Sequence, residues 1–335
     1  MSAVMEQALP APEWTDGERE RLSAAWRAGR LPHALLIHES PGAGGEWLAQ
    51  WVAQLVLCGE GPRAPCGSCT ACRRVAARAH PDLTWLTPEE NSRQIRIEQV
   101  RELAAELALT SHGGGYKAGI LSPADFMNRF AANALLKTLE EPPQQTLLVL
   151  VATAPSRLPP TVLSRCQRLS VRAPSRAQAL AWLNRARGPH AWDAALDTLG
   201  EAPLIAVRGD PEEVAAVGSE SRQALEALGA GRADPVALSE RWAKNELALR
   251  LQCFENWLTE RIRQAERQGA FMTEMRAGPY LSGGSPVLNI RELFRLIDAV
   301  RELRATLDVP LNRAVALESL FRRVAPSRVG TASEA

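Results

Sequence analysis

The stretch that decides the fold runs from residue 34 to residue 46 and reads Ala34-Leu35-Leu36-Ile37-His38-Glu39-Ser40-Pro41-Gly42-Ala43-Gly44-Gly45-Glu46. Residues 34–38 form a short apolar run, which predicts a buried strand, and residues 47–57 have the pattern of a helix. The glycines between these segments favour a sharp turn. A strand, a tight turn and a helix in this order are typical of an α/β domain.

Four further apolar runs predict strands at residues 82–86, 116–121, 146–152 and 169–171. The run at 146–152 is nearly all aliphatic, as expected for a central parallel strand that is covered on both faces. Helical patterns at 96–109 and 130–139 lie between these runs. After Pro174 the strand signals end, and we expect helices at 175–188, 191–199, 202–208, 245–268, 290–307 and 312–324.

The glycine turn departs from the pattern of a phosphate-binding loop. Such a loop needs G-x-x-x-x-G-K-[ST], because the glycines expose backbone N–H groups, the lysine reaches the phosphates and the hydroxyl binds Mg²⁺. Here Glu39 replaces the first glycine, Gly45 the lysine and Glu46 the hydroxyl. Gly42 and Gly44 remain, so we expect the turn to keep its shape without the function.

The end of the third predicted strand lacks the acidic residues that hold Mg²⁺ in an ATPase. Ser122 and Pro123 stand where an Asp-Glu pair is expected. Asp125 comes three residues later, and we interpret it as a cap of the following helix. Both halves of an ATPase site are therefore altered, and the sequence predicts a domain that neither binds nor hydrolyses ATP.

Four of the six cysteines, Cys58, Cys66, Cys69 and Cys72, are spaced C-x7-C-x2-C-x2-C. This spacing can supply four thiolates to one zinc ion, with no position left open for water, so we predict a structural site. The alternatives are two disulfides, a redox-active C-x-x-C pair or four unrelated thiols. Nothing in the sequence suggests secretion, which disfavours stable disulfides.

Composition narrows the classes of function. The chain has 335 residues, which suggests two or three domains. Its formal net charge is +1, which does not indicate nucleic acid as the main partner. We see no signal-peptide pattern and no run of about 18 apolar residues. We therefore expect a cytoplasmic protein without membrane contact.

Two stretches resemble hallmarks of the bacterial clamp-loader subunits, a clade of the AAA+ superfamily. They are Asn133-Ala134-Leu135-Leu136-Lys137-Thr138-Leu139-Glu140-Glu141-Pro142-Pro143 and Leu158-Pro159-Pro160-Thr161-Val162-Leu163-Ser164-Arg165-Cys166-Gln167. A four-cysteine zinc module after the first helix of the α/β domain also fits this family. The altered phosphate loop resembles the class of clamp-loader subunit that does not hydrolyse ATP. Together these motifs cover roughly residues 30 to 170.

The resemblance implies a fold of three parts. They are an α/β P-loop (AAA+, RecA-like) domain with a parallel sheet at 1–172, including the zinc module at 58–72, then a small helical lid at 173–209 and an all-α C-terminal collar at 210–327, before a tail at 328–335. It also implies a non-hydrolysing subunit of the DNA polymerase III holoenzyme, which supports ATP-driven loading of the sliding clamp onto primed DNA. Its implied partners are the motor subunits (gamma and tau) and the delta subunit in a five-subunit arc, with primer-template DNA and the clamp reached through the complex.

By position in the matched motif, Arg165 is implied to be an arginine finger that reaches the ATP of the adjacent motor subunit. A finger requires a planar, permanently charged group that crosses an interface. The alternative for Arg165 is an ordinary interdomain salt bridge. Thr153 matches a residue that senses the γ-phosphate in active relatives, and Leu204 stands near the position of a second sensing arginine.

Two other functions remain open at this point. One is an active AAA+ ATPase with a divergent nucleotide site. The other is a zinc-dependent DNA-binding protein, for which Arg63, Arg73, Arg74 and Arg78 would have to supply the basic surface. In the C-terminal helices we expect aromatic side chains to form core packing and subunit contacts rather than a base-stacking surface: Trp242, Phe254, Trp257, Phe294 and Phe321.

Overall fold

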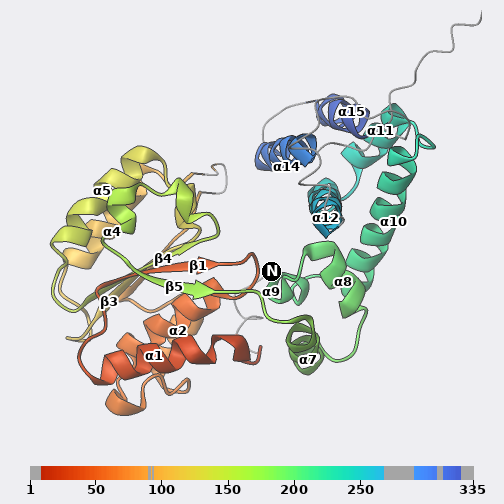
Figure 1. Ribbon diagram of the computed structural model, residues 1–335. Coiled ribbons are helices and arrows are strands. Elements are labelled where there is room, and N and C mark those ends of the chain that lie inside the picture. Colours follow the sequence, from red (N-terminus) through yellow and green to blue (C-terminus); the bar gives the residue numbers. More distant parts are fainter. Residues whose placement is uncertain (1–8, 90–91, 93, 268–289, 308–311, 326–335) are drawn as a thin grey trace, which may run out of the picture. The chain divides into compact units, whose positions relative to one another are not determined.

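The computed structural model describes residues 9–89, 92, 94–267, 290–307 and 312–325 (Figure 1). Contacts between Cα atoms divide the chain into two compact units. Unit 1 comprises residues 1–188 and 201–208, and unit 2 comprises residues 189–200 and 209–335. The two units are described separately below.

Unit 1 is built on one five-stranded sheet, with strand order β2-β3-β4-β1-β5. All four strand pairings are parallel, which confirms the predicted α/β class. The strands are β1 (Ala34–Glu39), β2 (Leu83–Leu86), β3 (Lys117–Leu121), β4 (Thr146–Ala152) and β5 (Gln167–Val171). Each lies within two residues of an apolar run in the sequence, because burial on both faces requires nearly continuous apolar side chains.

Helices cover both faces of this sheet (Figure 1). On one face, α4 (Ile97–Ala108) and α5 (Arg129–Glu140) pack over side chains such as Leu36 and Leu150. On the other face, α1 (Asp16–Arg27) and α2 (Gly45–Leu57) pack over side chains such as Leu35 and Ile37. Successive strand residues point to opposite faces, so β1 and β4 contribute to both layers of the core.

A glycine lets the helix layer approach the sheet closely. A Cβ atom on Gly119, in β3, would lie 2.9 Å from Leu103 Cδ1 of α4 and 3.3 Å from Leu148 Cδ1 of β4. Any side chain at this position would therefore require Leu103 and its neighbours to shift.

The structure contains helical segments in unit 1 that the periodicity did not predict. They are α1, α3 (Thr70–Ala76) and α6 (Pro160–Leu163), together with short 3₁₀ turns at Glu13–Thr15, Gly61–Arg63, Ala124–Phe126 and Pro155–Arg157. The short segments have too few turns to show a helical period. In α1 only Leu22 is buried, so the helix has a weak apolar stripe.

The segment predicted as a lid contributes to both units. Helices α7 (Arg176–Arg187) and α9 (Pro203–Ala206) belong to unit 1, whereas α8 (Trp192–Leu199) belongs to unit 2. In unit 1 the indole N–H of Trp182 in α7 donates to Pro10 O at 3.0 Å. The limits of the lid at 173–209 stay a prediction.

Unit 2 is helical throughout its described residues. After α8 it contains α10 (Pro211–Gly229), α11 (Pro235–Lys244), α12 (Leu247–Arg267), α14 (Ile290–Ala305) and α15 (Arg313–Val324). Its core is centred on Trp242, Phe254 and Phe321, and the rings of Trp242 and Phe321 meet edge to face at 5.1 Å. Phe294, in α14, has half of its surface exposed and lies outside this core, so the subunit contact expected of these aromatic side chains stays a prediction for it.

Ion pairs lie along the surface of the C-terminal helices. The carboxylate of Glu255 forms ion pairs with Arg301 at 2.6 Å and Arg304 at 3.2 Å. Glu292 forms an ion pair with Arg323 at 2.8 Å. These arginines of α14 and α15 thus pair with acids, of which Glu255 is nearly buried. None of the helices in the described part of the chain is long and apolar enough to cross a membrane.

The central strand β4 should contribute strongly to the stability of unit 1. Leu150 is fully buried, so Leu150→Ala should reduce the free energy of unfolding by about 2–5 kcal/mol. Leu109→Ala is the matched control, because Leu109 is 59% exposed and its truncation should cost less than about 0.5 kcal/mol. Urea unfolding followed by circular dichroism measures both variants, and equal shifts would contradict this account of the core.

Candidate functional site

A cavity of about 270 Å³ lies in unit 1 where several strands end. Because β1, β4 and β3 are parallel neighbours, the residues that follow them meet at the carboxyl edge of the sheet, where open α/β sheets bind ligands. The cavity wall brings together residues that the sequence singled out: Glu39, Gly42, Gly44, Glu46, Ser122, Pro123, Thr153 and Leu204.

The glycine turn forms as the sequence predicts. Gly42 and Gly44 have φ angles of +68° and +104°, a region that side chains disfavour. The turn is also covered closely by α9, since a Cβ on Gly42 would lie 2.7 Å from Ala202 Cβ. Leu204 N donates to Gly42 O at 3.1 Å, which ties α9 to the turn.

The carboxyl group of Glu39 lies inside the turn. Its Oε2 atom accepts a hydrogen bond of 2.5 Å from the backbone N–H of Gly45, the first residue of α2. Burial raises the pKa of Glu39 to about 7, and the nearby charge of Glu46 acts in the same direction. Hydrogen bonds from the backbone of Gly45 and Gly44, and the charge of Arg208, oppose that rise in the pKa.

A second carboxylate, that of Glu46, lines the cavity beside the turn. Glu46 Oε1 accepts a 2.6 Å hydrogen bond from Ser122 Oγ, and its Oε2 lies 3.6 Å from Arg78 Nη2. The guanidinium of Arg78 also stacks on Trp85, 3.8 Å from the ring centroid. No pattern in the sequence predicts Arg78 as a member of this site, because the residue reaches the cavity from beyond α3.

Asp125 does not cap the helix that follows it, contrary to our prediction. Asn128 is the cap of α5 and accepts from Ala131 N at 2.8 Å. Asp125 Oδ2 instead accepts from Ala154 N at 2.9 Å and from Thr153 Oγ1 at 3.2 Å. The 3₁₀ turn at Ala124–Phe126 directs this buried carboxylate toward the end of β4, where it orients Thr153.

Arg165 lies outside the cavity wall, just after α6. Its Nη2 atom pairs with Glu140 Oε1 at 2.7 Å, and its Nη1 donates to Thr161 O at 2.9 Å. Ser164 Oγ is 3.3 Å from the same Nη1. The alternative prediction for Arg165 was an interdomain salt bridge, but the observed partner belongs to the same unit. More than a third of the side chain remains exposed.

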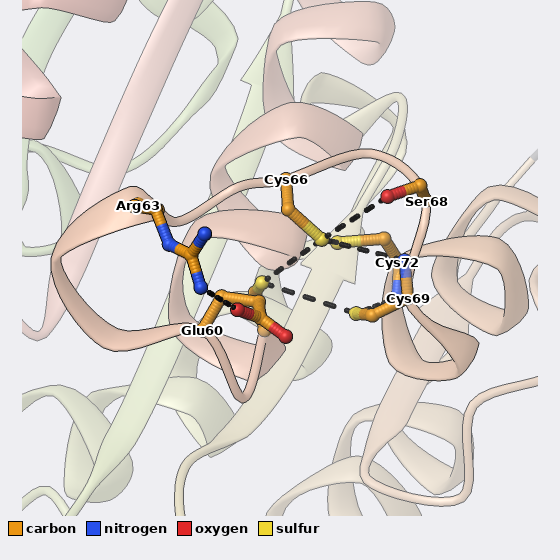
Figure 2. A network of polar contacts seen from close by, with 7 residues as sticks. Glu60, Arg63, Cys66, Ser68, Cys69 and Cys72 are labelled. Atoms are coloured by element: carbon orange, nitrogen blue, oxygen red, sulfur yellow. Dashed lines mark hydrogen bonds and ion pairs between the residues drawn. The ribbon is translucent and has the colours of Figure 1, made fainter.

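The four predicted metal ligands converge at the other end of α2. Cys58 caps that helix, Cys69 caps α3 and Cys72 lies in its first turn. Figure 2 shows the side chains of Cys66, Cys69 and Cys72 turned toward one another. All four sulfurs lie within 4.8 Å of one another, which is compatible with a zinc site.

The sulfur geometry fits a tetrahedral ion. The Sγ atoms of Cys58 and Cys66 are 3.7 Å apart, those of Cys58 and Cys69 3.9 Å, and those of Cys66 and Cys72 4.0 Å. Four Zn–S bonds of about 2.3 Å in a tetrahedron place the sulfurs about 3.8 Å apart. A disulfide would need about 2.05 Å.

Backbone groups around the cysteines favour thiolates. Cys69 N donates to Cys66 Sγ at 3.3 Å, and Cys72 N donates to Cys69 Sγ at 3.4 Å. Hydrogen bonds from the backbone of Cys69 and Ser68 lower the pKa of Cys66 to about 6. Burial raises the pKa of Cys58 and Cys72, so a cation is required to hold all four as thiolates near neutral pH.

The basic residues beside the cysteines are largely engaged by the chain itself. Arg63 pairs with Glu60 at 2.7 Å, Arg73 donates to Ser68 O at 2.9 Å, and Arg78 faces the cavity described above. These contacts weaken the alternative of a zinc-dependent DNA-binding protein.

Comparison with known proteins shows the family of this chain. Residues 16–175 match the family described as "DNA polymerase III, delta subunit". DNA polymerase III subunit delta' of Pseudomonas aeruginosa is 34% identical over 301 residues, covering 86% of this chain and 90% of the relative. DNA polymerase III subunit tau of Escherichia coli is 33% identical over 146 residues, covering 43% of this chain and 22% of the relative.

A crystal structure of a DNA polymerase III gamma subunit-related protein from Thermotoga maritima is similar with a TM-score of 0.46 and 16% identity, covering 90% of this chain and 98% of that one. The extent of the match to the Pseudomonas relative is what decides the family. The chain belongs to the delta' subunits of the DNA polymerase III clamp loader.

Proposed function

We propose that this chain is a non-hydrolysing member of its clamp loader, which supports ATP-driven loading of the sliding clamp onto primed DNA and donates Arg165 to the ATP site of an adjacent subunit. The observation that carries the proposal is the state of its own nucleotide-like cavity. Glu39 and Glu46 turn carboxylates toward the positions where an ATPase would need phosphate and Mg²⁺.

The chemistry of the cavity opposes a bound triphosphate. No lysine follows the turn, and two carboxylates face the space where phosphate charge would lie. In a partly dry site, the repulsion between a phosphate and the charge of Glu46, or of Glu39 when it is ionised, exceeds the ~1 kcal/mol expected for a close pair in water. At the end of β3, Ser122 donates its hydroxyl to Glu46, so neither group is oriented to hold a metal ion with a nucleotide.

Arg165 has the properties that a finger acting on a neighbouring subunit requires. Thr161 O and Ser164 Oγ fix one edge of its guanidinium, while the other edge pairs with Glu140. The Glu140 side chain is half exposed, and an ion pair of this kind contributes only about 0–1 kcal/mol. Exchanging Glu140 for the phosphate of a partner's nucleotide would therefore cost little, and such fingers accelerate hydrolysis by about 10³–10⁵ in other systems.

The assembly that we propose follows the family. A lid at 173–209 would join the α/β domain (1–172) to a collar (210–327), which would hold the chain in a five-subunit arc with gamma or tau motor subunits and a delta subunit. DNA and the sliding clamp would be reached through the complex, in the cytoplasm. The match of 146 residues of this chain to a tau subunit supports a common ancestry of this chain and the motor subunits.

For the four cysteines we propose a structural zinc ion. When bound, zinc would link the end of α2 to the start of α3. With Cys58, Cys66, Cys69 and Cys72 all serving as ligands, no site would remain for a reacting water.

A divergent ATPase is the second candidate, because the cavity next to the turn persists with a volume of about 270 Å³. Calorimetry of the purified chain with ATP and Mg²⁺ at high micromolar concentration separates the two. We expect no heat of binding, since the lysine is missing and Glu39 and Glu46 oppose phosphate. A dissociation constant in the low micromolar range would favour the divergent ATPase instead.

Arg165→Ala should lower the ATPase rate of the assembled clamp loader while leaving assembly intact. At the one ATP site that Arg165 faces we expect a loss of about 10³-fold or more, and unaltered sites set the residual rate. Arg168→Ala is the control, because Arg168 is an exposed arginine three residues away on β5. Steady-state turnover and gel filtration measure the two effects, and an unchanged rate in an intact complex would refute the finger.

Cys69→Ser should release zinc and reduce the free energy of unfolding by more than about 2 kcal/mol, because the ion would lose one of four ligands. Ser68→Ala is the control, since Ser68 offers Cys66 only a weak contact of 3.8 Å. Metal analysis by atomic emission and thermal unfolding test the prediction. Wild-type protein purified under reducing conditions without zinc would count against the site.

A further inference from the structure

The position of the Glu39 side chain is more specific than simple repulsion of phosphate requires. Glu39 is the last residue of β1, and its carboxyl folds back to the start of α2. It accepts there from Gly45 N at 2.5 Å, and the backbone of Gly44 also contributes a hydrogen bond. These are the N–H groups at the beginning of a helix, the kind of donors that bind anions in phosphate loops.

We propose that Glu39 is an intramolecular ligand of this turn. Its carboxyl occupies the place that a phosphate group would take, and this occupancy is the reason that the cavity does not bind phosphates. This inference rests on the proposed non-hydrolysing function and names the residue responsible for it. It differs from an explanation by charge alone, in which Glu39 and Glu46 would repel phosphate equally.

The first argument is the state of the N–H groups. Backbone donors that are withdrawn from water must find an acceptor, or the fold loses stability. In a working phosphate loop the nucleotide is that acceptor. Here the Glu39 carboxyl is the acceptor. The turn therefore keeps its anion-binding shape, with φ angles of +68° at Gly42 and +104° at Gly44.

The second argument explains the glycine where an ATPase has lysine. A Cβ atom on Gly45 would lie 2.8 Å from Cδ and Oε2 of Glu39 and 2.9 Å from its Cβ. Gly45 is not among the residues with positive φ, so its backbone does not itself require glycine. The Glu39 side chain therefore accounts for Gly45, and the loss of the glycine and of the lysine from the phosphate-loop pattern have one physical cause.

The charges around Glu39 also fit an occupied anion site. Glu46, in the first turn of α2, adds negative charge, whereas Arg208, just after α9, adds positive charge. Arg78 approaches Glu46 at 3.6 Å from beyond α3. Ser122, at the end of β3, directs its hydroxyl to Glu46 and not to Glu39. The turn's own N–H groups are thus the main partners of the Glu39 carboxyl.

A double-mutant cycle tests the contact between Glu39 and Gly45. In wild-type protein, Gly45→Ala should lower the melting temperature by about 3 °C or more, because the new Cβ collides with Glu39. In the Glu39→Gly background, which removes the Cβ of residue 39 together with its carboxyl, the same change should raise the melting temperature by about 1–3 °C, because alanine is favoured over glycine at a helical position. The relevant transition is the one that Leu150→Ala also shifts, which identifies unit 1.

The reversal of sign is the expected result of this cycle. If Gly45→Ala has the same effect in both backgrounds, the Glu39 side chain does not occupy the turn, and the inference fails. This measurement needs no ligand and remains decisive even if no variant binds phosphate.

Binding of inorganic pyrophosphate tests whether the Glu39 carboxyl in the turn is the reason that the cavity does not bind phosphates. Glu39→Ala vacates the turn, and it should bind pyrophosphate at least about ten-fold more tightly than wild-type protein, as expected for the one or two charge-assisted hydrogen bonds made available. Glu39→Gln keeps an amide oxygen within reach of Gly45 N and should behave like wild type. Glu46→Gln, which removes the other carboxylate but leaves the turn filled, should also behave like wild type.

Calorimetry at constant ionic strength gives these affinities, and circular dichroism verifies that each variant is folded. Improved binding by Glu39→Gln and Glu46→Gln to the level of Glu39→Ala would replace the inference with repulsion by charge. A folded Glu39→Ala variant that binds no better than wild type would also overturn it. Neither result touches the proposed function, which fails only if wild-type protein binds MgATP or if Arg165 is dispensable for turnover.

Discussion

The parallel pairing of β1 with β4 is the constraint on which the rest of unit 1 depends. Their register runs from Ala34 opposite Leu148 to His38 opposite Ala152, so both strands end at the same edge of the sheet. That alignment places Glu39 and Thr153 on one cavity, and β3 adds Ser122 from the other side of β4. Because both faces of these strands are buried under helices, a slip in register would expose apolar side chains and is therefore strongly disfavoured.

Helix α2 connects the two unusual features of the unit. It begins at the glycine turn and ends at the cap residue Cys58, and its 13 residues span about 20 Å at 1.5 Å per residue. Gln54 in its last turns donates to Cys72 O at 3.0 Å, so the cysteine segment is tied to the helix by a hydrogen bond as well as by chain continuity. A metal ion at the four cysteines would fix the far end of the helix whose first residue contacts Glu39. We regard this as a reason for a structural site at that place.

Sequence reasoning succeeded where one physical effect dominates, and failed where two distant residues decide together. The aliphatic run at 146–152 could only be a strand covered on both faces, and the cysteine spacing already limited the chemistry to a few choices. Asp125 was misjudged because both Asp125 and Asn128 are suitable caps, and only the path of the 3₁₀ turn decides between them. The contact between Glu39 and Gly45 could not be predicted, since the reach of a carboxyl group across a turn leaves no trace in a pattern.

The two charged sites of unit 1 satisfy their polar groups in opposite ways. In the cavity, Glu39 meets the N–H of Gly45 and Glu46 meets the hydroxyl of Ser122, so the groups that a nucleotide would need are already paired. A site whose polar groups are paired within the chain is more stable than an empty ATPase site, because each unpaired buried donor costs about 1–3 kcal/mol. Arg165 instead holds a half-exposed partner that it can exchange at little cost. If the proposed role is right, both arrangements suit it, since polar groups paired within the chain keep the turn in one shape while an exchangeable arginine remains able to act at an interface.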